Sequence, residues 1–310
     1  MKANHTIHQH CHHTVWNHAI EPVLSVAPGE SVSFEVMDAS GGQFTRKSTS
    51  ADVPGIDFAQ VNPVTGPVYV EGAEPGDTLE VLIEEFGTLS WGWTAIIPGF
   101  GLLADEFKDP YLKIWDLDNQ KTAEFLPGIE LPVKPFPGTI GVALPEPGDH
   151  GIVPPRKNGG NMDIRHLTKG AKLYLPVWVT GALFSVGDTH AAQGDGEVCG
   201  TAIEAPMHIK LSFKLHKGKM IQEPRFETPG PLTTGLDEKG YYVTTGHASD
   251  LMDASKNAVR YMIEHLEKEH GISRQEAYAL SSVAVDLKIS EIVDVPNYLI
   301  SAYLPKRIFT

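Results

Sequence analysis

Glycine and proline interrupt this sequence at short intervals and leave only brief apolar stretches between them. The chain of 310 residues holds 30 glycines and 23 prolines, and both residues break helices and initiate turns. The segments between them are rich in β-branched residues or alternate between apolar and polar positions, which is typical of strands. We expect strands at residues 23–26, 31–37, 68–70, 78–84, 172–179, 182–186, 198–203 and 208–215.

The pattern changes at Gly246. Apolar residues at helical spacing predict a helix that begins at Ser249 and ends at Gly271. A capping box of Ser273 and Glu276 predicts a second helix, and residues 298–304 form a last strand. The sequence therefore predicts a mainly β body, a sandwich or barrel, over residues 1–245. An α/β portion over 246–310 packs on it and need not be an independent domain.

Composition excludes several classes of protein. The chain has 25 Lys and Arg against 39 Asp and Glu, a net charge of −14, so a nucleic-acid partner is not expected. Apolar runs such as 173–179 are far too short to cross a bilayer, and no targeting segment opens the chain. Two cysteines are too few for a disulfide framework, so a cytoplasmic protein is expected. The proline-rich stretches 126–137 and 145–155 are predicted to be long connections that form walls of a pocket.

The densest polar cluster lies at residues 187–197, with the sequence GDTHAAQGDGE between two predicted strands. Asp188 and His190 are two residues apart, so an extended backbone directs both side chains to one side, where they could bind one metal ion. The glycines would let the loop fold back and bring Asp195 or Glu197 near the same point. Such a site could acidify water with its metal and move protons with a carboxylate. The alternative is a solvated hairpin loop.

Each of the other candidate site residues has two interpretations. Asp38 precedes a double glycine and either forms a turn or brings a carboxylate to a site. Asn161 and Asp163 follow Gly159 and Gly160 and suit either a turn or the binding of a carbonyl or a ligand histidine. Cys199 could be a thiol nucleophile beside Glu197, or a small core residue.

Histidines gather near the N-terminus. They are either mobile and bind metal adventitiously, or are anchored through the two that precede Trp16. These residues are His5, His8, His10, His12, His13 and His18.

The run GALFSVGDTHAAQGDGE at 181–197, continued by VCGTAIE at 198–204, resembles the signature of the acetamidase/formamidase family. Further similar pieces extend from the first strands to the last helices, so the resemblance covers nearly the whole chain. They are Asp38-Ala39 with Gln43, residues 66–73, Pro154-Pro155, residues 159–163, and Asp250-Leu251-Met252 with Ala254.

The resemblance implies an enzyme that hydrolyses a small linear amide to ammonia and a carboxylate, with acetamide-like substrates slightly preferred over formamide. It also implies a bound divalent ion, with zinc favoured and calcium as a second or structural ion. The N-terminal histidines depart from the family pattern.

On this basis the ion is expected on Asp188 and His190, with Asp38 or Glu204 as further ligands. Glu197 or Asp195 would carry the proton, and Asn161 and Gln193 would position the amide or share the oxyanion charge. Asp163 and Gln43 would bind substrate.

Two alternatives stay open. One is the same reaction through a Cys199 thioester, and the other is a β-sandwich that binds a metal or small ligand without turnover. A homo-oligomer is expected in each case.

Overall fold

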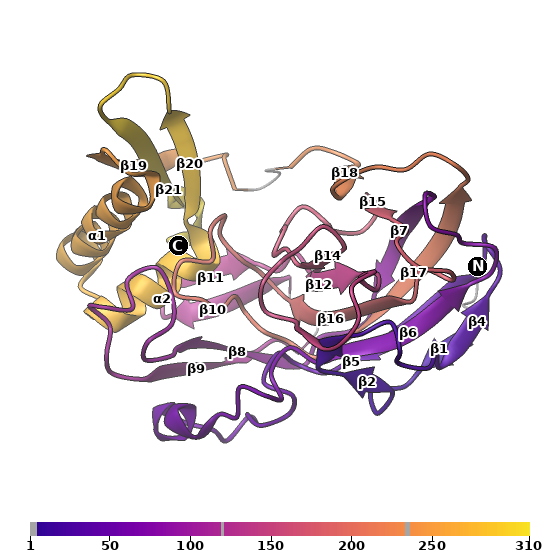
Figure 1. The fold of residues 1–310 in the computed structure, drawn as a ribbon. Helices are drawn as coiled ribbons and strands as arrows, with labels where there is room; N and C mark the ends of the chain where they lie inside the picture. The colour runs from indigo at the N-terminus through magenta and orange to yellow at the C-terminus, as the bar shows by residue number, and fades with distance from the viewer. Residues whose placement is uncertain (1–4, 119–120, 233–235) are drawn as a thin grey trace.

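The computed structural model describes residues 5–118, 121–232 and 236–310. Two sheets face each other and form a sandwich that makes up most of the chain (Figure 1). In the first sheet the strand order is β1 (His5–Ile7), β5 (Ser31–Val36), β17 (Met207–His216), β7 (Thr78–Phe86), β15 (Lys172–Pro176) and β18 (Arg225–Glu227).

The second sheet carries the polar motif. Its order is β14 (Gly159–Asn161), β12 (Phe136–Gly141), β16 (Phe184–His190), β6 (Val64–Val70) and β2 (His12–His13), with β4 (Leu24–Val26) also paired to β6. Side chains that alternate inward from both sheets fill the space between them, as expected for a sandwich. Phe34 from β5 and Phe213 from β17 meet Phe184 of β16 in this core.

In the described part of the chain, three two-stranded pairs complete the body. Two join strands that follow each other in the chain, β8 (Trp91–Ile96) with β9 (Tyr111–Asp116) and β10 (Thr122–Leu126) with β11 (Ile129–Pro132), and the third pairs β3 (Val15–Trp16) with the distant β13 (His150–Gly151). Two 3₁₀ turns, Ser50–Gly55 and Lys306–Ile308, complete the body and the C-terminus.

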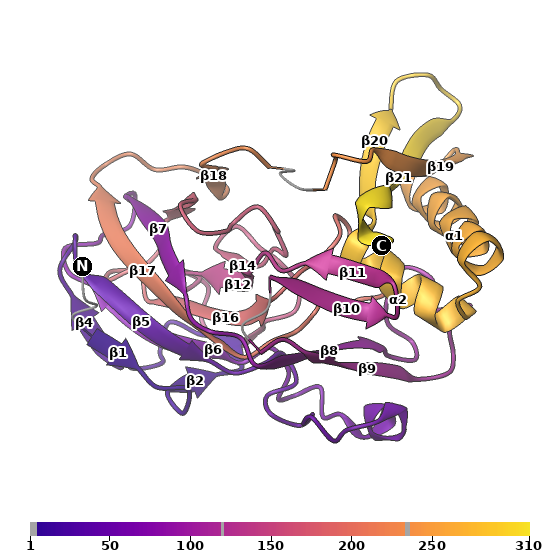
Figure 2. The same cartoon turned by 180° about the vertical axis from the view of Figure 1, so that it is seen from behind.

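The C-terminal portion is a small α/β layer at the end of the molecule away from the N-terminus (Figures 1 and 2). Strands β19 (Tyr241–Ala248), β21 (Tyr298–Pro305) and β20 (Asp286–Glu291) form its sheet. Helix α1 (Leu251–His270) packs on this sheet and on helix α2 (Arg274–Ala284). One hydrophobic core joins residues of both helices to residues of the β8, β9, β10 and β11 hairpins.

The helix ends follow the predicted signals with one shift. Asp250, rather than Ser249, caps α1 and accepts from the amides of Met252 and Asp253. Gly271 ends α1 in the left-handed region, and the Ser273–Glu276 capping box begins α2. No helix within the described ranges is long and apolar enough to cross a membrane.

The mainly β prediction is confirmed, but two local predictions are wrong. Residues 198–203 form no strand, because Gly200 lies at φ +92° and the chain turns there. The stretch 126–137 is not one long connection, since it holds β11 and the first residues of β12. The stretch 145–155 contains only the two residues of β13, and Val153 and Pro155 line a cavity, as predicted for a pocket wall.

The histidines nearest Trp16 are anchored. His13 lies in β2, where its Nδ1 is 2.7 Å from the carbonyl oxygen of Val15 and its Nε2 is 2.8 Å from Oγ of Ser185. A carbonyl can only accept, so Nδ1 carries the proton and Nε2 accepts from the serine hydroxyl. Burial, together with the neighbouring His12, lowers the pKa of His13 to about 4 although the Val15 carbonyl opposes this. His13 is therefore a neutral structural residue.

This burial makes part of the folding stability depend on pH. Between about pH 6.5 and 4 the unfolded chain binds a proton at His13 that the folded chain does not, so stability rises with pH across this window. His13→Gln should be less stable at pH 7 but should lose less stability than the wild type between pH 7 and 5. The difference should be on the order of 1–3 kcal/mol, measured by urea unfolding at both pH values. His10→Gln, at an exposed position, should follow the wild type, and a parallel loss in His13→Gln would contradict the assignment.

Candidate metal and catalytic site

Strand β16 delivers two side chains of the motif into one buried cluster. Asp188 and His190 lie in this strand, in antiparallel register with β12, and both are buried. The first part of the motif is therefore strand and not a solvated loop. Glu204 reaches the same place because its backbone forms a bridge with His190.

These three residues form the first of two groups. Nε2 of His190 lies 3.0 Å from Oε2 of Glu204 and 3.2 Å from Oδ1 of Asp188. The other carboxylate oxygen of Glu204 accepts from the amide of Ala202 at 2.7 Å. Three of the four residues predicted as metal ligands thus lie with their ligand atoms within 4.8 Å of one another.

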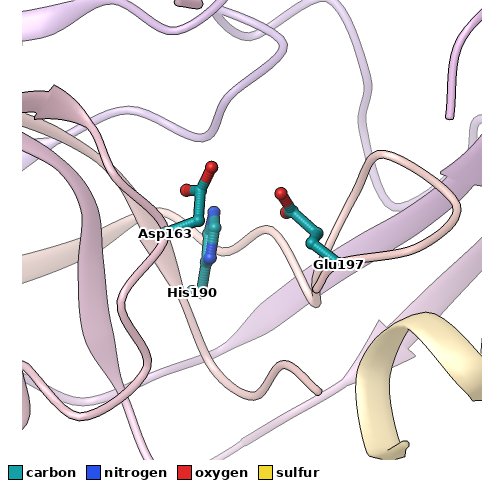
Figure 3. A group of neighbouring side chains, drawn as sticks. All are labelled: Asp163, His190 and Glu197. Carbon is teal, nitrogen blue, oxygen red and sulfur yellow. The ribbon is translucent and has the colours of Figure 1, made fainter. Parts of the chain in front are cut away.

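The second group shares the same histidine. Ligand atoms of Asp163, His190 and Glu197 also lie within 4.8 Å of one another. Figure 3 shows the carboxylates of Asp163 and Glu197 approaching from opposite sides, with the imidazole beside Asp163. Asp163 comes from the segment after β14 and Glu197 from the turn at the end of the motif, so the fold brings together residues from separate parts of the chain.

Gln193 fixes the orientation of His190. The amide nitrogen of Gln193 donates to the carbonyl oxygen of Asp163 at 2.9 Å, which leaves its Oε1 3.0 Å from Nδ1 of the imidazole. Because Oε1 can only accept, Nδ1 of His190 carries a proton, and Nε2 is the nitrogen that faces the carboxylates. Metal-binding histidines are usually oriented in this way, by a hydrogen bond from the ring nitrogen that does not bind the metal.

A polar network holds the second oxygen of Asp188. Oδ2 accepts from Nδ2 of Asn62 at 3.1 Å and from the hydroxyl of Thr139 at 3.2 Å. The same two donors also contact Oδ1 of Asn161, whose amide nitrogen donates to Asp163 at 3.1 Å. Asn161 therefore connects the two acidic groups.

Burial and mutual repulsion shift the pKa values in the cluster. Burial first, then Asp163, raises the pKa of Glu197 well above its ordinary value, and burial raises that of Glu204 to about 8 and that of Asp163 to about 6. Burial alone would lower the pKa of His190, but Glu204 and Asp188 raise it well above 6.5. Burial would raise the pKa of Asp188, but His190 and the hydrogen bonds hold it below its ordinary value.

The cluster has the features that a bound cation would satisfy. It places four carboxyl groups around one imidazole, with Asp188 and Glu204 buried and Asp163 and Glu197 partly buried, and ionising all four is costly without a counter-ion. Among the described residues, Oδ1 of Asp163 is buried without a hydrogen-bond partner, and Oε2 of Glu204 is buried with only Nε2 of His190 beside it, at 3.0 Å. Both oxygens belong to the two groups, so the residues present fit a divalent ion.

The backbone around the cluster is strained. Of the six non-glycine residues with positive φ in the described ranges, four belong to the site: Asn62, Asp163, Asp188 and Glu197, at φ 42–50°. Such conformations cost energy and are retained mainly at functional sites. Gly138 lies behind the cluster, where a Cβ would come 2.6 Å from Oδ1 of Asp163 and 2.8 Å from Cε1 of His190.

A cavity of about 720 Å³ opens onto both groups. Asn62, Asn161 and Gln193 line its polar part together with the acidic residues of the cluster. The rest of its wall is mainly apolar and includes Phe58, Ile97, Phe100, Val153, Pro155 and Met162.

Three predicted site residues lie outside the cluster. Oδ1 of Asp38 accepts from the Ser40 amide at 2.9 Å, from the Ser40 hydroxyl and from Nε1 of Trp93 at 2.8 Å, as in the turn interpretation. Gln43 is used within its own loop, where its amide group bonds the backbones of Ser40 and Asp57.

Asp195 also points away. Its carboxylate lies 3.2 Å from Nε of Arg165 and is 38% exposed. Cys199 is fully buried, with its Sγ 3.4 Å from the carbonyl oxygen of Ala95, and burial raises the pKa of its thiol. Neither residue lines the cavity as the described residues define it.

Sequence reasoning missed Asn62, Thr139 and Gly138. Each lies on a strand or loop far from the motif and carries no pattern of its own. One signal was present: Asn62 precedes Pro63, and Asn is among the few residues that adopt positive φ readily. Its position beside β16 follows only from the pairing of β6 with β16.

Comparisons with known proteins show similarity to one family over nearly the whole chain. The model of the acetamidase/formamidase family matches residues 1–148 and 148–310. A formamidase from Methylophilus methylotrophus is 30% identical over 96% of this chain and 89% of its own length. An acetamidase from Mycolicibacterium smegmatis is also 30% identical, over 86% of this chain and 84% of its own length.

Solved structures give the same result. A gamma lactamase from Delftia acidovorans superposes with a TM-score of 0.89 at 30% identity and covers 96% of this chain and 89% of its own. An acetamidase from Bacillus halodurans gives a TM-score of 0.69 at 31% identity, with 96% of each chain covered. The chain belongs to the acetamidase/formamidase family.

Proposed function

We propose that this protein hydrolyses linear amides to a carboxylate and ammonia or an amine. The observation that carries the proposal is the group of four carboxyls around one imidazole at the polar end of a cavity. Membership in a family whose relatives are named formamidase and acetamidase supports the reaction class.

In the reaction, the oxygen of water bonds to the amide carbon, the C–N bond breaks, and the nitrogen leaves with a proton. Glu197 is suited to accept the proton from water and return it to the nitrogen, because it faces the cavity and burial keeps its carboxyl easy to protonate. Asn161 also lines the cavity, and the second hydrogen of its amide nitrogen could donate to the carbonyl oxygen of the substrate.

Gln193 positions the imidazole, because its amide oxygen contacts Nδ1 of His190 and its amide nitrogen donates to the carbonyl oxygen of Asp163. It also lines the cavity, and the second hydrogen of its amide nitrogen could donate to the substrate, as predicted.

Asp188, His190 and Glu204 would hold a divalent ion. One nitrogen and several carboxylate oxygens form a donor set that favours zinc. When bound, such an ion makes water more acidic and polarises the amide carbonyl.

Two variants should distinguish the role of metal binding from that of proton transfer. Asp188→Asn should lose both, because it removes a ligand charge. Glu197→Gln should keep the metal and lose turnover by about 10²–10⁴-fold, the usual contribution of an acid–base residue. Metal per chain is measured by mass spectrometry on protein purified without affinity metal, and ammonia release from acetamide is measured before and after chelation.

Asp195→Asn is the matched control in the same motif. Its carboxylate pairs with Arg165 outside the cluster, so most turnover should remain. A loss as large as that of Glu197→Gln would move the proton-carrying role to Asp195. Full metal content and turnover in Asp188→Asn would overturn the metal site, and metal binding without ammonia release from any amide would overturn the enzyme.

Gly138→Ala should damage the site without removing any of its functional groups. The new methyl group would push on Asp163 and His190, and a misplacement of about 1 Å can cost roughly 10²-fold in rate. The readouts are kcat/KM for acetamide and the melting temperature. Gly151→Ala adds the same methyl group where nothing lies within 4 Å and should be neutral. Equal kcat/KM values in the two variants would show that the close packing of Gly138 against the cluster is not needed for turnover.

Cys199→Ser tests the thioester alternative. The thiol is buried against Ala95, so the serine variant should keep most of its turnover. Iodoacetamide should not inactivate the folded wild type. A folded serine variant with no turnover would instead support Cys199 as the nucleophile.

A further inference from the structure

The cavity is much larger than the smallest amides require. Its volume of about 720 Å³ lies within the range of about 300–1,000 Å³ typical of pockets that enclose drug-sized ligands. Acetamide would occupy on the order of 100 Å³, if each non-hydrogen atom takes about the 30 Å³ share of a liquid water molecule. Most of the cavity would then hold only water around such a substrate.

The space beyond the acidic cluster has an apolar wall. Phe58, Phe100 and Val153 line it and are still 55%, 38% and 36% exposed. Ile97 and Trp93 line it as buried residues. Apolar side chains that stay accessible inside a cavity can gain contact area from an apolar ligand.

The ring of Phe100 is held in its position. A Cβ at residue 200 would lie 2.5 Å from Cδ1 of Phe100, so the ring packs directly over Gly200. The preceding and following backbone is also fixed, because the amide of Phe100 donates to Ile97 and the amide of Leu102 donates to Val198. Phe100 is therefore a fixed part of the wall, next to the turn that carries Glu197.

The charge of the lining restricts the ligand further. Among the described residues that line the cavity, four are acidic and none is Lys, Arg or His. A substituent that carries a carboxylate would lose its hydration on entry and would find no cationic side chain in the lining as a partner. A neutral apolar substituent does not meet this cost.

We propose that the site is selective for neutral amides that carry an apolar substituent of about six to ten carbon atoms. This inference rests on the proposed amide hydrolysis and names its substrate class. The amide group lies at the acidic cluster, and the substituent contacts Phe100, Phe58 and Val153. The substituent is on the acyl carbon or on the nitrogen, since both would extend from the cluster into the same space.

A substrate series tests the proposal on the metal-loaded enzyme. The kcat/KM should rise from acetamide to hexanamide by up to about fourfold for each methylene that becomes buried. Phenylacetamide and N-benzylacetamide, followed by release of ammonia and of benzylamine, distinguish the acyl arrangement from the nitrogen arrangement. At least one should exceed acetamide by tenfold or more. Succinamate should be a poorer substrate than pentanamide, which has a similar size and no charge.

Substitutions in the apolar wall test which residues cause the preference for apolar amides. Phe100→Ala and Phe58→Ala should each lower the ratio of kcat/KM for the favoured aromatic amide over acetamide by about three- to tenfold. Tyr261→Ala removes an aromatic ring that is 50% exposed on α1, outside the cavity, and should leave this ratio unchanged.

The possible outcomes distinguish the proposed selectivity for apolar amides from the proposed amide hydrolysis. Efficient release of ammonia from acetamide, with no gain for any apolar amide, would overturn the selectivity and keep the amidase. An unchanged ratio in both wall variants would also overturn it. Absence of product from every amide in the metal-loaded enzyme would overturn the proposed function instead.

Discussion

The crowding of four carboxyl groups around His190 is the constraint on which the rest of the site depends. Asp188 and Glu204 are buried beside the imidazole, and Asp163 and Glu197 are partly buried next to it. Such an arrangement is unfavourable unless each oxygen is bonded or paired with a cation. The surrounding network of Asn62, Thr139 and Asn161 meets part of this need. Oδ1 of Asp163 has no donor and Oε2 of Glu204 has only the imidazole beside it, so these two oxygens mark where a cation would complete the site.

The rest of the fold keeps these groups in place against strain. Arg165 donates to the carbonyl oxygen of Gln193 at 3.2 Å, and its guanidinium pairs with Asp195 and with Asp286 at the start of β20. This two-sided pairing fixes the turn between His190 and Glu197 to the C-terminal sheet. Close backbone contact adds to it, since a Cβ on Gly194 would lie 2.1 Å from the carbonyl oxygen of Val285. The C-terminal portion thus supports the site although it contributes no residue to the cluster.

The sequence was informative wherever a local pattern carried the information. Glycine and proline spacing predicted a mainly β fold. Apolar residues at helical spacing predicted the first helix, and a capping box predicted the second. The two-residue spacing of Asp188 and His190 predicted their common side of the strand. Local patterns could not indicate that Asp195 turns toward Arg165 while Glu197 turns toward Asp163, because both acids follow glycine in the same motif. That choice depends on the left-handed conformation of Glu197 and on an arginine more than twenty residues earlier.

The cluster and the apolar wall of the cavity differ in the same way, because the first depends mainly on a local motif and the second on distant loops. The chemical groups come mainly from one strand and its following turn, whose sequence is constrained by buried charge and close backbone contacts. The apolar wall of the cavity comes from three separate loops, around Phe58, Phe100 and Val153, and none of these three side chains belongs to the cluster. Relatives at about 30% identity are named for different amides, as formamidase, acetamidase and gamma lactamase. A fixed cluster with a replaceable wall is an arrangement in which one fold can keep its reaction while its preferred substrate changes.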